Sequence, residues 1–138
     1  MSSSNLELVR SITAAHARGD FSCIEWADPE IEYVIVDGPS PGKWTGPAAM
    51  AASFRGNLTG WKDFRVEVDE YRELDDKRVL VLTRTSAQGK SGGLVVGQMR
   101  AKGAVLYHLG DGKVTRLVYY WDRERALTDV GDASAARP

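Results

Sequence analysis

The second half of the chain has the residue pattern of successive β-strands. This pattern limits the possible folds more than any other feature of the sequence. Four runs have the β-branched and aromatic composition of strands, over residues 64–71, 78–87, 94–109 and 113–121. The segments between them are short and rich in turn residues, and they include the GDG turn at 110–112. We therefore expect four consecutive strands that form an antiparallel meander.

The first half has a different period. Apolar residues at helical spacing predict a helix over 5–18, a shorter helix over 20–26 that ends before Asp28-Pro29, and a third helix over 46–58 with Pro47 at its first position. The run EIEYVIV at 30–36 predicts an early strand. Helices and strands that are segregated in this way indicate an α+β fold, with three N-terminal helices packed on a curved, mostly antiparallel sheet.

Composition limits the possible classes of protein. The 138 residues, 43% of them apolar, correspond to one domain, 1–138, whose last residues, 129–138, are small and polar and are expected to fray. The net charge of −1 with scattered Lys and Arg argues against a nucleic-acid partner. No apolar run approaches the roughly 20 residues of a membrane span, and the N-terminus lacks a secretory core, so we expect a cytoplasmic protein with no membrane partner.

Cysteine and histidine are scarce. Cys23 is the only cysteine, and His16 and His108 are the only histidines. A single cysteine forms no internal disulfide, and these three residues have no spacing that resembles a zinc site. We expect neither a metal nor a cofactor.

Several stretches together resemble a known family. The succession ARGDF, WADPEIEY, GKWTGPAAMAASF and LGDGKVTRLVYYWDRERAL is similar to the SnoaL-like polyketide cyclases and steroid Δ-isomerases of the nuclear-transport-factor-2-like superfamily, over about residues 5–128. The resemblance implies a cone-shaped fold whose helices and curved sheet enclose a mostly apolar pocket. Such folds host isomerases, cyclases, hydrolases and proteins that only bind, so the chemistry has to be argued from the residues.

Asp37 has two interpretations. An aspartate before a glycine is an ordinary turn residue, because its side chain can bond the backbone two residues further on. In steroid isomerases a catalytic base leaves the first strand at a fixed distance before the third helix, and counting back from Gly46 places Asp37 there. Counting forward from Trp26 places that base at Val34 instead. Because the two registers disagree, we expect a turn residue and keep the pocket base as the alternative.

The other groups of the isomerase site are missing. The resemblance places the two hydrogen-bond donors that stabilise an enolate at Ile12 and at Ala104 or Val105, and none of these side chains can donate. We therefore do not expect the steroid isomerase reaction by the family's usual route.

Other polar candidates each have a structural alternative. His16 lies one helical turn beyond Ile12 and either enters the pocket or interacts with the helix dipole. His108 either enters the pocket or ends a solvated strand. Asp122 matches an aspartate that many SnoaL-like proteins carry at this strand end, but it also suits the N-cap of a short helix over 123–127.

Alternation in the last strand predicts which side chains face the pocket. Leu117, Tyr119 and Trp121 share one face, and Trp121 matches an aromatic residue that lines the isomerase pocket. The predicted ligand-binding set is Ile12, Trp26, Phe54, His108, Leu117, Tyr119 and Trp121. Val118 and Tyr120 then face outward and predict a homodimer through the outer face of the sheet.

Three functions remain open. The first is a pocket for a small apolar molecule, with isomerase- or cyclase-like proton transfer beside a carbonyl by Asp37, His16 or Asp122. The second is a non-catalytic protein that binds a ligand or a protein partner. The third is water activation as in limonene epoxide hydrolases, for which Asp63, Arg84 and Asp122 supply the residue types.

Overall fold

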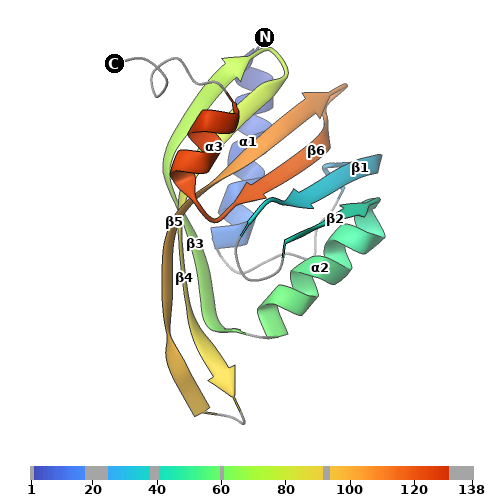
Figure 1. The fold of residues 1–138 in the computed structure, drawn as a ribbon. Coiled ribbons are helices and arrows are strands. Elements are labelled where there is room, and N and C mark those ends of the chain that lie inside the picture. The colour runs from blue at the N-terminus through green and yellow to red at the C-terminus, as the bar shows by residue number, and fades with distance from the viewer. Residues whose placement is uncertain (1, 18–24, 38–40, 60, 92–93, 131–138) are drawn as a thin grey trace.

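The computed structural model describes residues 2–17, 25–37, 41–59, 61–91 and 94–130 (Figure 1). Within these ranges the side chains of 2–4, 54–59, 61–65, 87–91 and 94–100 are outside the description. The elements in chain order are α1 (Ser2–Ala17), β1 (Ala27–Ile35), β2 (Gly42–Thr45), α2 (Pro47–Thr59), β3 (Trp61–Asp75), β4 (Arg78–Ser91), β5 (Leu94–Gly110), β6 (Lys113–Tyr120) and α3 (Arg123–Asp129).

All six strands form one sheet in the order β2-β1-β6-β5-β4-β3. The predicted meander is confirmed, because β3, β4, β5 and β6 pair in succession as antiparallel neighbours. β1 runs parallel to β6, and the short strand β2 pairs antiparallel with β1. The fold is therefore α+β with a mixed, mostly antiparallel sheet, and β2 is a strand that the sequence pattern did not predict.

The prediction of three N-terminal helices is not confirmed. The first and third predicted helices correspond to α1 and α2. Of the predicted second helix, Glu25 and Trp26 lie in a turn and β1 begins at Ala27, while 20–24 lie outside the described residues. The third helix of the described chain is α3, which follows the last strand.

One face of the sheet, which we call the inner face, carries α1 and α2. Val9 and Ile12 of α1 and Met50 of α2 are almost fully buried there against the sheet. The strand residues in this core alternate along β1, β4 and β5, as expected when one face is buried, whereas β6 has an irregularity between Val114 and Leu117. They are Ala27, Ile31, Tyr33, Ile35, Val79, Val81, Val105, Tyr107, Leu109, Val114 and Leu117.

The opposite face, which we call the outer face, is partly covered by α3. Ala126 of α3 is buried in a second apolar cluster with Val118, Tyr120 and Leu106. Val118 and Tyr120 are each only 4% exposed, so the chain's own helix buries them. The reason given above for a homodimer is therefore wrong, because these two side chains need no second subunit, and the homodimer itself stays a prediction.

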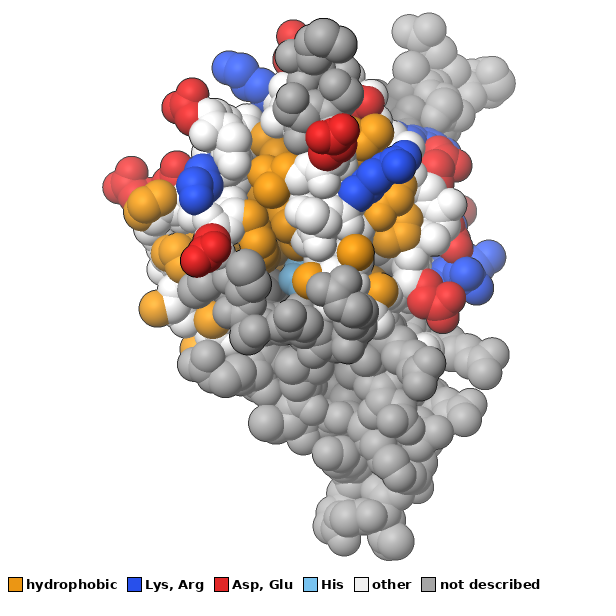
Figure 2. All heavy atoms as spheres, turned by 180° about the vertical axis from the view of Figure 1, so that it is seen from behind, with side chains coloured by type: hydrophobic (Ala, Val, Ile, Leu, Met, Phe, Trp, Pro, Cys, Tyr) orange, Lys and Arg blue, Asp and Glu red, His pale blue; other side chains and the backbone are white. Residues whose placement is uncertain are grey.

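The surface carries charges of both signs. On the side opposite to that of Figure 1, acidic and basic side chains lie interspersed around a central group of hydrophobic ones (Figure 2). Among the described residues, no helix has the length and apolar character needed to cross a membrane.

Candidate functional site

Asp37 joins the ends of two parallel strands. It lies two residues beyond the end of β1, and its Oδ1 accepts a hydrogen bond of 2.6 Å from the backbone N–H of Trp121, just beyond the end of β6. Its other oxygen, Oδ2, is buried and has no hydrogen-bond partner in the described part of the chain. One oxygen of the carboxylate is thus held by the backbone, while the other is free to accept a proton or a hydrogen bond.

Alternation along β1 places Asp37 on the inner face. Ile35 belongs to the inner core, whereas Val36 packs with the outer cluster. Val36 also continues the pairing beyond the end of β1, because its N–H donates to the carbonyl of Tyr119. The next side chain in an extended chain returns to the face of Ile35, and this is the face of Trp121.

The predicted local turn bond is replaced by a long-range one. The residue two positions after Asp37 is Pro39, which has no N–H to donate, so the bond that defines an ordinary aspartate turn cannot form with it. The bond to Trp121 instead connects residues 84 positions apart. Pro39 is the signal in the sequence that argued against a turn role.

A second buried polar atom without a partner lies at the same end of the sheet. Thr83 of β4 is 1% exposed, and its Oγ1 has no hydrogen-bond partner among the described residues. Thr83 pairs with Gly103, and a Cβ on Gly103 would lie 3.4 Å from the Cα of Trp121. Thr83 therefore pairs with the part of β5 that lies beside Trp121, the residue that binds Asp37.

Tyrosine hydroxyls add donors to the inner face. The Tyr119 hydroxyl lies 3.0 Å from Thr85 Oγ1, and the Tyr119 ring packs against Trp121 at 5.9 Å between ring centroids. Burial raises the pKa of Tyr119, against the opposing effect of the Thr85 hydrogen bond. The phenol therefore stays protonated at neutral pH and serves as a hydrogen-bond donor.

Tyr33 and Tyr107 are phenols that the sequence interpretation missed. Each is at most 2% exposed, and burial is the main cause that raises the pKa of both. The Tyr107 hydroxyl makes no hydrogen bond within the described residues, although Tyr71 and Tyr119 are close enough to affect its pKa. The alternation that placed Tyr119 inward would have placed these two tyrosines on the same face.

His16 and Trp26 form a separate pair. Their rings meet edge to face at 6.2 Å between centroids. Trp26 immediately precedes β1, while Asp37 follows it, and nine extended residues span up to about 30 Å. The structure therefore places His16 with Trp26, at the other end of β1 from Asp37.

The remaining predicted pocket residues divide into two groups. Ile12 and Leu117 are both 2% exposed in the inner core. The inward orientation of Leu117, Tyr119 and Trp121 is confirmed, since all three belong to that core or pack against it. Phe54 lies in α2, but its side chain is outside the described residues.

Asp122 and His108 lie elsewhere. Asp122 caps α3, where its Oδ1 accepts from the N–H of Glu124 at 3.0 Å, so the cap interpretation is confirmed. His108 is half-buried on β5, in register with Arg78 and Arg116 rather than with the inner core. Arg84 forms ion pairs with Asp69 and Glu67, and the side chain of Asp63 is outside the description.

Among the described residues, no group of three or more His, Cys, Asp or Glu side chains is arranged to hold a metal ion. In the part of the chain that the structure describes, the inner face carries the fixed carboxylate of Asp37, several buried phenols and an apolar lining.

Comparisons with solved structures settle the architecture. A nuclear-transport-factor-2-like protein of unknown function from Burkholderia pseudomallei K96243 superposes with a TM-score of 0.74 at 21% identity, over 91% of this chain and 95% of that chain. The chain has the nuclear-transport-factor-2-like fold. The resemblance to the nuclear-transport-factor-2-like superfamily that the sequence indicated is therefore confirmed for the fold.

Two further structures share this fold. A protein with the provisional name SnoaL-like polyketide cyclase, from Jannaschia sp. CCS1, has a TM-score of 0.72 at 19% identity, with 99% and 94% of the two chains covered. A protein with a ketosteroid isomerase-like fold from Catenulispora acidiphila, in complex with trimethylamine, has a TM-score of 0.69 at 13% identity, with 96% and 98% covered. No protein-family model and no curated protein matches the sequence.

Proposed function

We propose that the inner face beside Asp37 forms a pocket for a small, mostly apolar molecule that carries a carbonyl group, and that Asp37 moves a proton next to that carbonyl. The observation that carries this proposal is the Asp37 carboxylate, which is fixed through Oδ1 and has a buried Oδ2 with no hydrogen-bond partner among the residues that the structure describes. A buried acceptor without a partner costs about 1–3 kcal/mol of folding stability. We therefore expect the Oδ2 atom of Asp37 to have a function that offsets this cost.

The geometry of Asp37 suits a general base. A carboxylate held by a backbone N–H keeps one orientation, and its free oxygen can approach an acidic C–H of a bound molecule. Proton removal from the carbon beside a carbonyl transfers the electron pair to the carbonyl oxygen and gives an enolate. Return of the proton to another carbon completes an isomerisation, whereas attack of the enolate carbon on a second carbonyl closes a ring.

The enolate oxygen needs a hydrogen-bond donor. The family's two donor positions are filled here by Ile12 and by Val105 on the inner face. The buried phenols of Tyr107 and Tyr119, both kept protonated by their raised pKa, are the donors that this chain offers in their place. We assign the enolate-stabilising role to this pair.

The similar structures share the fold and assign neither a reaction nor a substrate. One carries the provisional name SnoaL-like polyketide cyclase, and another is described by its ketosteroid isomerase-like fold. At identities of 19% and 13% this similarity supports the fold, and the role of Asp37 rests on its own geometry.

The first experiment identifies a ligand by thermal shift against steroids, polyketide fragments and terpenoids. A ligand at 100 times its Kd stabilises the folded chain by about 2.7 kcal/mol, which is readily measured as a rise in Tm. The second experiment follows exchange of the proton beside the carbonyl of the best ligand for deuterium from D2O.

We expect Asp37→Asn to abolish this deuterium exchange while leaving Tm nearly unchanged. The amide oxygen of asparagine still accepts from the N–H of Trp121, but the base is lost. Asp37→Ala loses both the base and this bond, so its unfolding free energy falls by about 1–3 kcal/mol.

Exchange that continues at the wild-type rate in Asp37→Asn would refute the catalytic role. Ligand binding by a wild-type protein that promotes no exchange would instead support the alternative of a binding protein without catalysis.

A further inference from the structure

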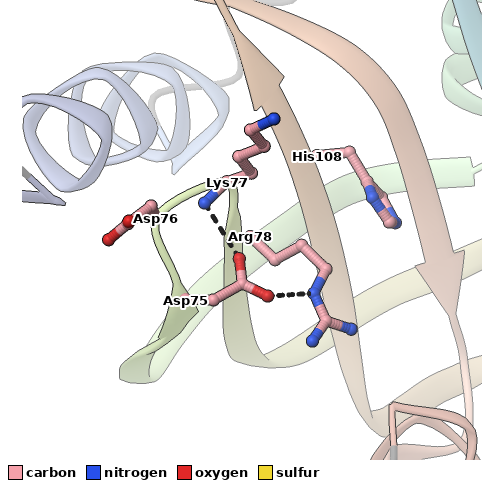
Figure 3. A pocket seen from close by; sticks show the side chains of 5 residues that line it. All are labelled: Asp75, Asp76, Lys77, Arg78 and His108. Atoms are coloured by element: carbon pink, nitrogen blue, oxygen red, sulfur yellow. Dashed lines mark hydrogen bonds and ion pairs between the residues drawn. The ribbon is translucent and has the colours of Figure 1, made fainter.

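A pocket lies at the β3–β4 turn. It has a volume of about 400 Å³ and is lined by Asp75, Asp76, Lys77, Arg78 and His108 (Figure 3). Asp75 ends β3, Asp76 and Lys77 form the turn, and Arg78 and His108 face each other as a cross-strand pair on β4 and β5. This site uses none of the residues assigned above to proton transfer.

Two residues of the pocket, Arg78 and His108, belong to a row of basic side chains across three strands. Arg78 pairs with His108, and His108 pairs with Arg116 of β6. Each of the three lies two positions from a residue of the outer cluster, namely Leu80, Leu106 and Val118, and residues two apart in a strand share a face, so the row lies on the outer face. Side chains of like charge directly opposite each other in a sheet destabilise it.

Of the three carboxylates near this row, Asp75 and Glu32 have partners. Asp75 accepts from Arg78 Nε at 2.8 Å through Oδ2 and from the backbone N–H of Lys77 at 2.9 Å through Oδ1. At the other end, Glu32 is in register with Arg116 but forms its ion pair with Lys43 at 2.8 Å. Figure 3 shows Asp76 pointing away from His108.

Several hydrogen-bond donors are left over. Only the Nε of Arg78 contacts Asp75, so the two terminal nitrogens of its guanidinium group have no such partner. Within the described residues, the side chains of His108 and Arg116 make no hydrogen bond or ion pair. Lys77, Arg78 and His108 line the pocket together with Asp75 and Asp76, and Arg116 is the cross-strand neighbour of His108. Because Asp75 already accepts from Arg78 and Lys77, the donors that remain for an added anion among the described residues are the terminal nitrogens of Arg78, the His108 ring and Arg116.

We propose that this pocket binds an oxyanion group, a phosphate or a carboxylate, of a small molecule through Arg78 and His108 of its lining and through Arg116, the cross-strand neighbour of His108. Guanidinium groups bind such planar or tetrahedral oxyanions through paired, charge-assisted hydrogen bonds. The volume exceeds that of a bare ion and leaves room for an organic part against the aliphatic stems of the lysine and arginine side chains.

Binding of an anion here is coupled to protonation of His108. Burial, followed by the charges of Arg116 and Arg78, holds the pKa of His108 below its usual value, and Asp75 only partly opposes this effect. An anion between the two arginines would offset their charges and raise the pKa of His108, so affinity should increase as the pH falls through the range in which His108 titrates.

The chain allows a direct test by NMR because it contains only two histidines. We would titrate the full chain with inorganic phosphate, with acetate and with chloride at constant ionic strength, and follow the ring signals of both histidines. We expect the His108 signals to shift saturably with phosphate or acetate and its pKa to rise, while the His16 signals stay in place. Phosphate and acetate distinguish the two kinds of oxyanion.

Two variants provide the matched comparison. Arg116→Gln should weaken binding roughly tenfold, the loss expected when one charged donor is removed. Lys102→Gln removes a basic residue from the same strand as His108, six residues or about 20 Å away, and should leave the affinity unchanged.

An equal shift with chloride, a response that does not saturate, or equal weakening by both variants would overturn the proposal. If Arg116→Gln fails to fold, the contrast between the two histidines in the wild-type chain still decides it.

Discussion

At the scale of single residues, Asp37 shows how one side chain can serve structure and chemistry together. Its Oδ1 links the ends of β1 and β6 through Trp121, and its Oδ2 is buried with no partner in the described part of the chain. The structural bond would be equally good with an asparagine, so the structure alone gives no reason for the negative charge. The charge is the part of Asp37 that the proposed function uses.

The β5–β6 turn gives a second residue-scale prediction. Asp111 and Gly112 have φ values of +51° and +76°, so the turn needs two successive residues in the left-handed region. Gly112→Val should lower the unfolding free energy by about 1–3 kcal/mol, because a β-branched residue is strained in this region although its side chain would meet no neighbour. Chemical denaturation would measure the loss.

Gly110→Ala is the control for this turn. Gly110 is not among the residues with positive φ, and a Cβ there would touch only the Thr115 side chain at an ordinary 3.4 Å. Equal stability of Gly112→Val and wild type would show that the turn tolerates the strain.

At the scale of elements, α3 is fastened to the sheet by one arginine. Arg123 donates to the carbonyls of Thr83 and Gly103 at 2.8 and 3.3 Å, and to the Asp69 carboxylate at 2.7 Å. It thereby links the first turn of a seven-residue helix to β3, β4 and β5. A helix this short is not stable alone, so its position over Val118 and Tyr120 depends on such contacts.

We therefore expect Arg123→Gln to lower the unfolding free energy by about 1–3 kcal/mol and to expose the outer cluster to hydrophobic dyes. Arg125→Gln is the matched control, because Arg125 is exposed and its contact with Asp129 is 3.9 Å long, so the change should stay within about 0.5 kcal/mol. Equal effects of the two variants would contradict a fastening role for Arg123.

The contact between Arg123 and Asp69 predicts that folding stability depends on pH in the acidic range. The hydrogen bond that Asp69 accepts from Arg123, together with the contribution of Arg84, holds the pKa of Asp69 below its usual value of 3.8. The stabilisation is complete above that value and is lost as the pH falls through the lower pKa of the folded chain. As the pH falls below about 4, the unfolding free energy of Asp69→Asn should therefore decrease less than that of wild type. An equal decrease in both proteins, measured by denaturation at several pH values, would contradict the role of the Asp69 carboxylate.

The elements also show what the sequence could predict. The meander and the first and third predicted helices have clear periods, and the structure contains them. The covering of Val118 and Tyr120 was missed because it depends on where α3 returns to the sheet, which local patterns do not encode. The bond between Asp37 and Trp121 was missed for the same reason, since parallel pairing of β1 and β6 joins distant segments.

At the scale of the whole molecule, the sheet separates two chemically different sites. The inner face combines an apolar core with Asp37, Tyr107 and Tyr119, whereas the outer face carries α3 and the row from Arg78 through His108 to Arg116. β5 contributes to both, because Tyr107 faces inward and His108 outward. Occupation of one face could therefore influence the other only through the backbone of shared strands.

The outer row also affects the stability of the whole chain as the pH changes. The pKa of His108 is below its usual value of 6.5 in the folded chain, chiefly through burial and then through Arg116 and Arg78. As the pH falls below that value, the unfolded chain takes up this proton more readily than the folded chain does. Stability should therefore decrease from pH 6.5 down to the pKa of the folded chain and then level off.

Thermal unfolding of wild type and His108→Gln between pH 8 and about pH 5 would measure this effect. The variant has no group to protonate at this position, so its Tm should fall less than that of wild type over the interval. Inorganic phosphate at constant ionic strength should reduce the loss in wild type, because an anion between Arg78 and Arg116 favours the protonated imidazole. Equal pH dependence of the two proteins would mean that the basic row does not contribute to folding stability through His108.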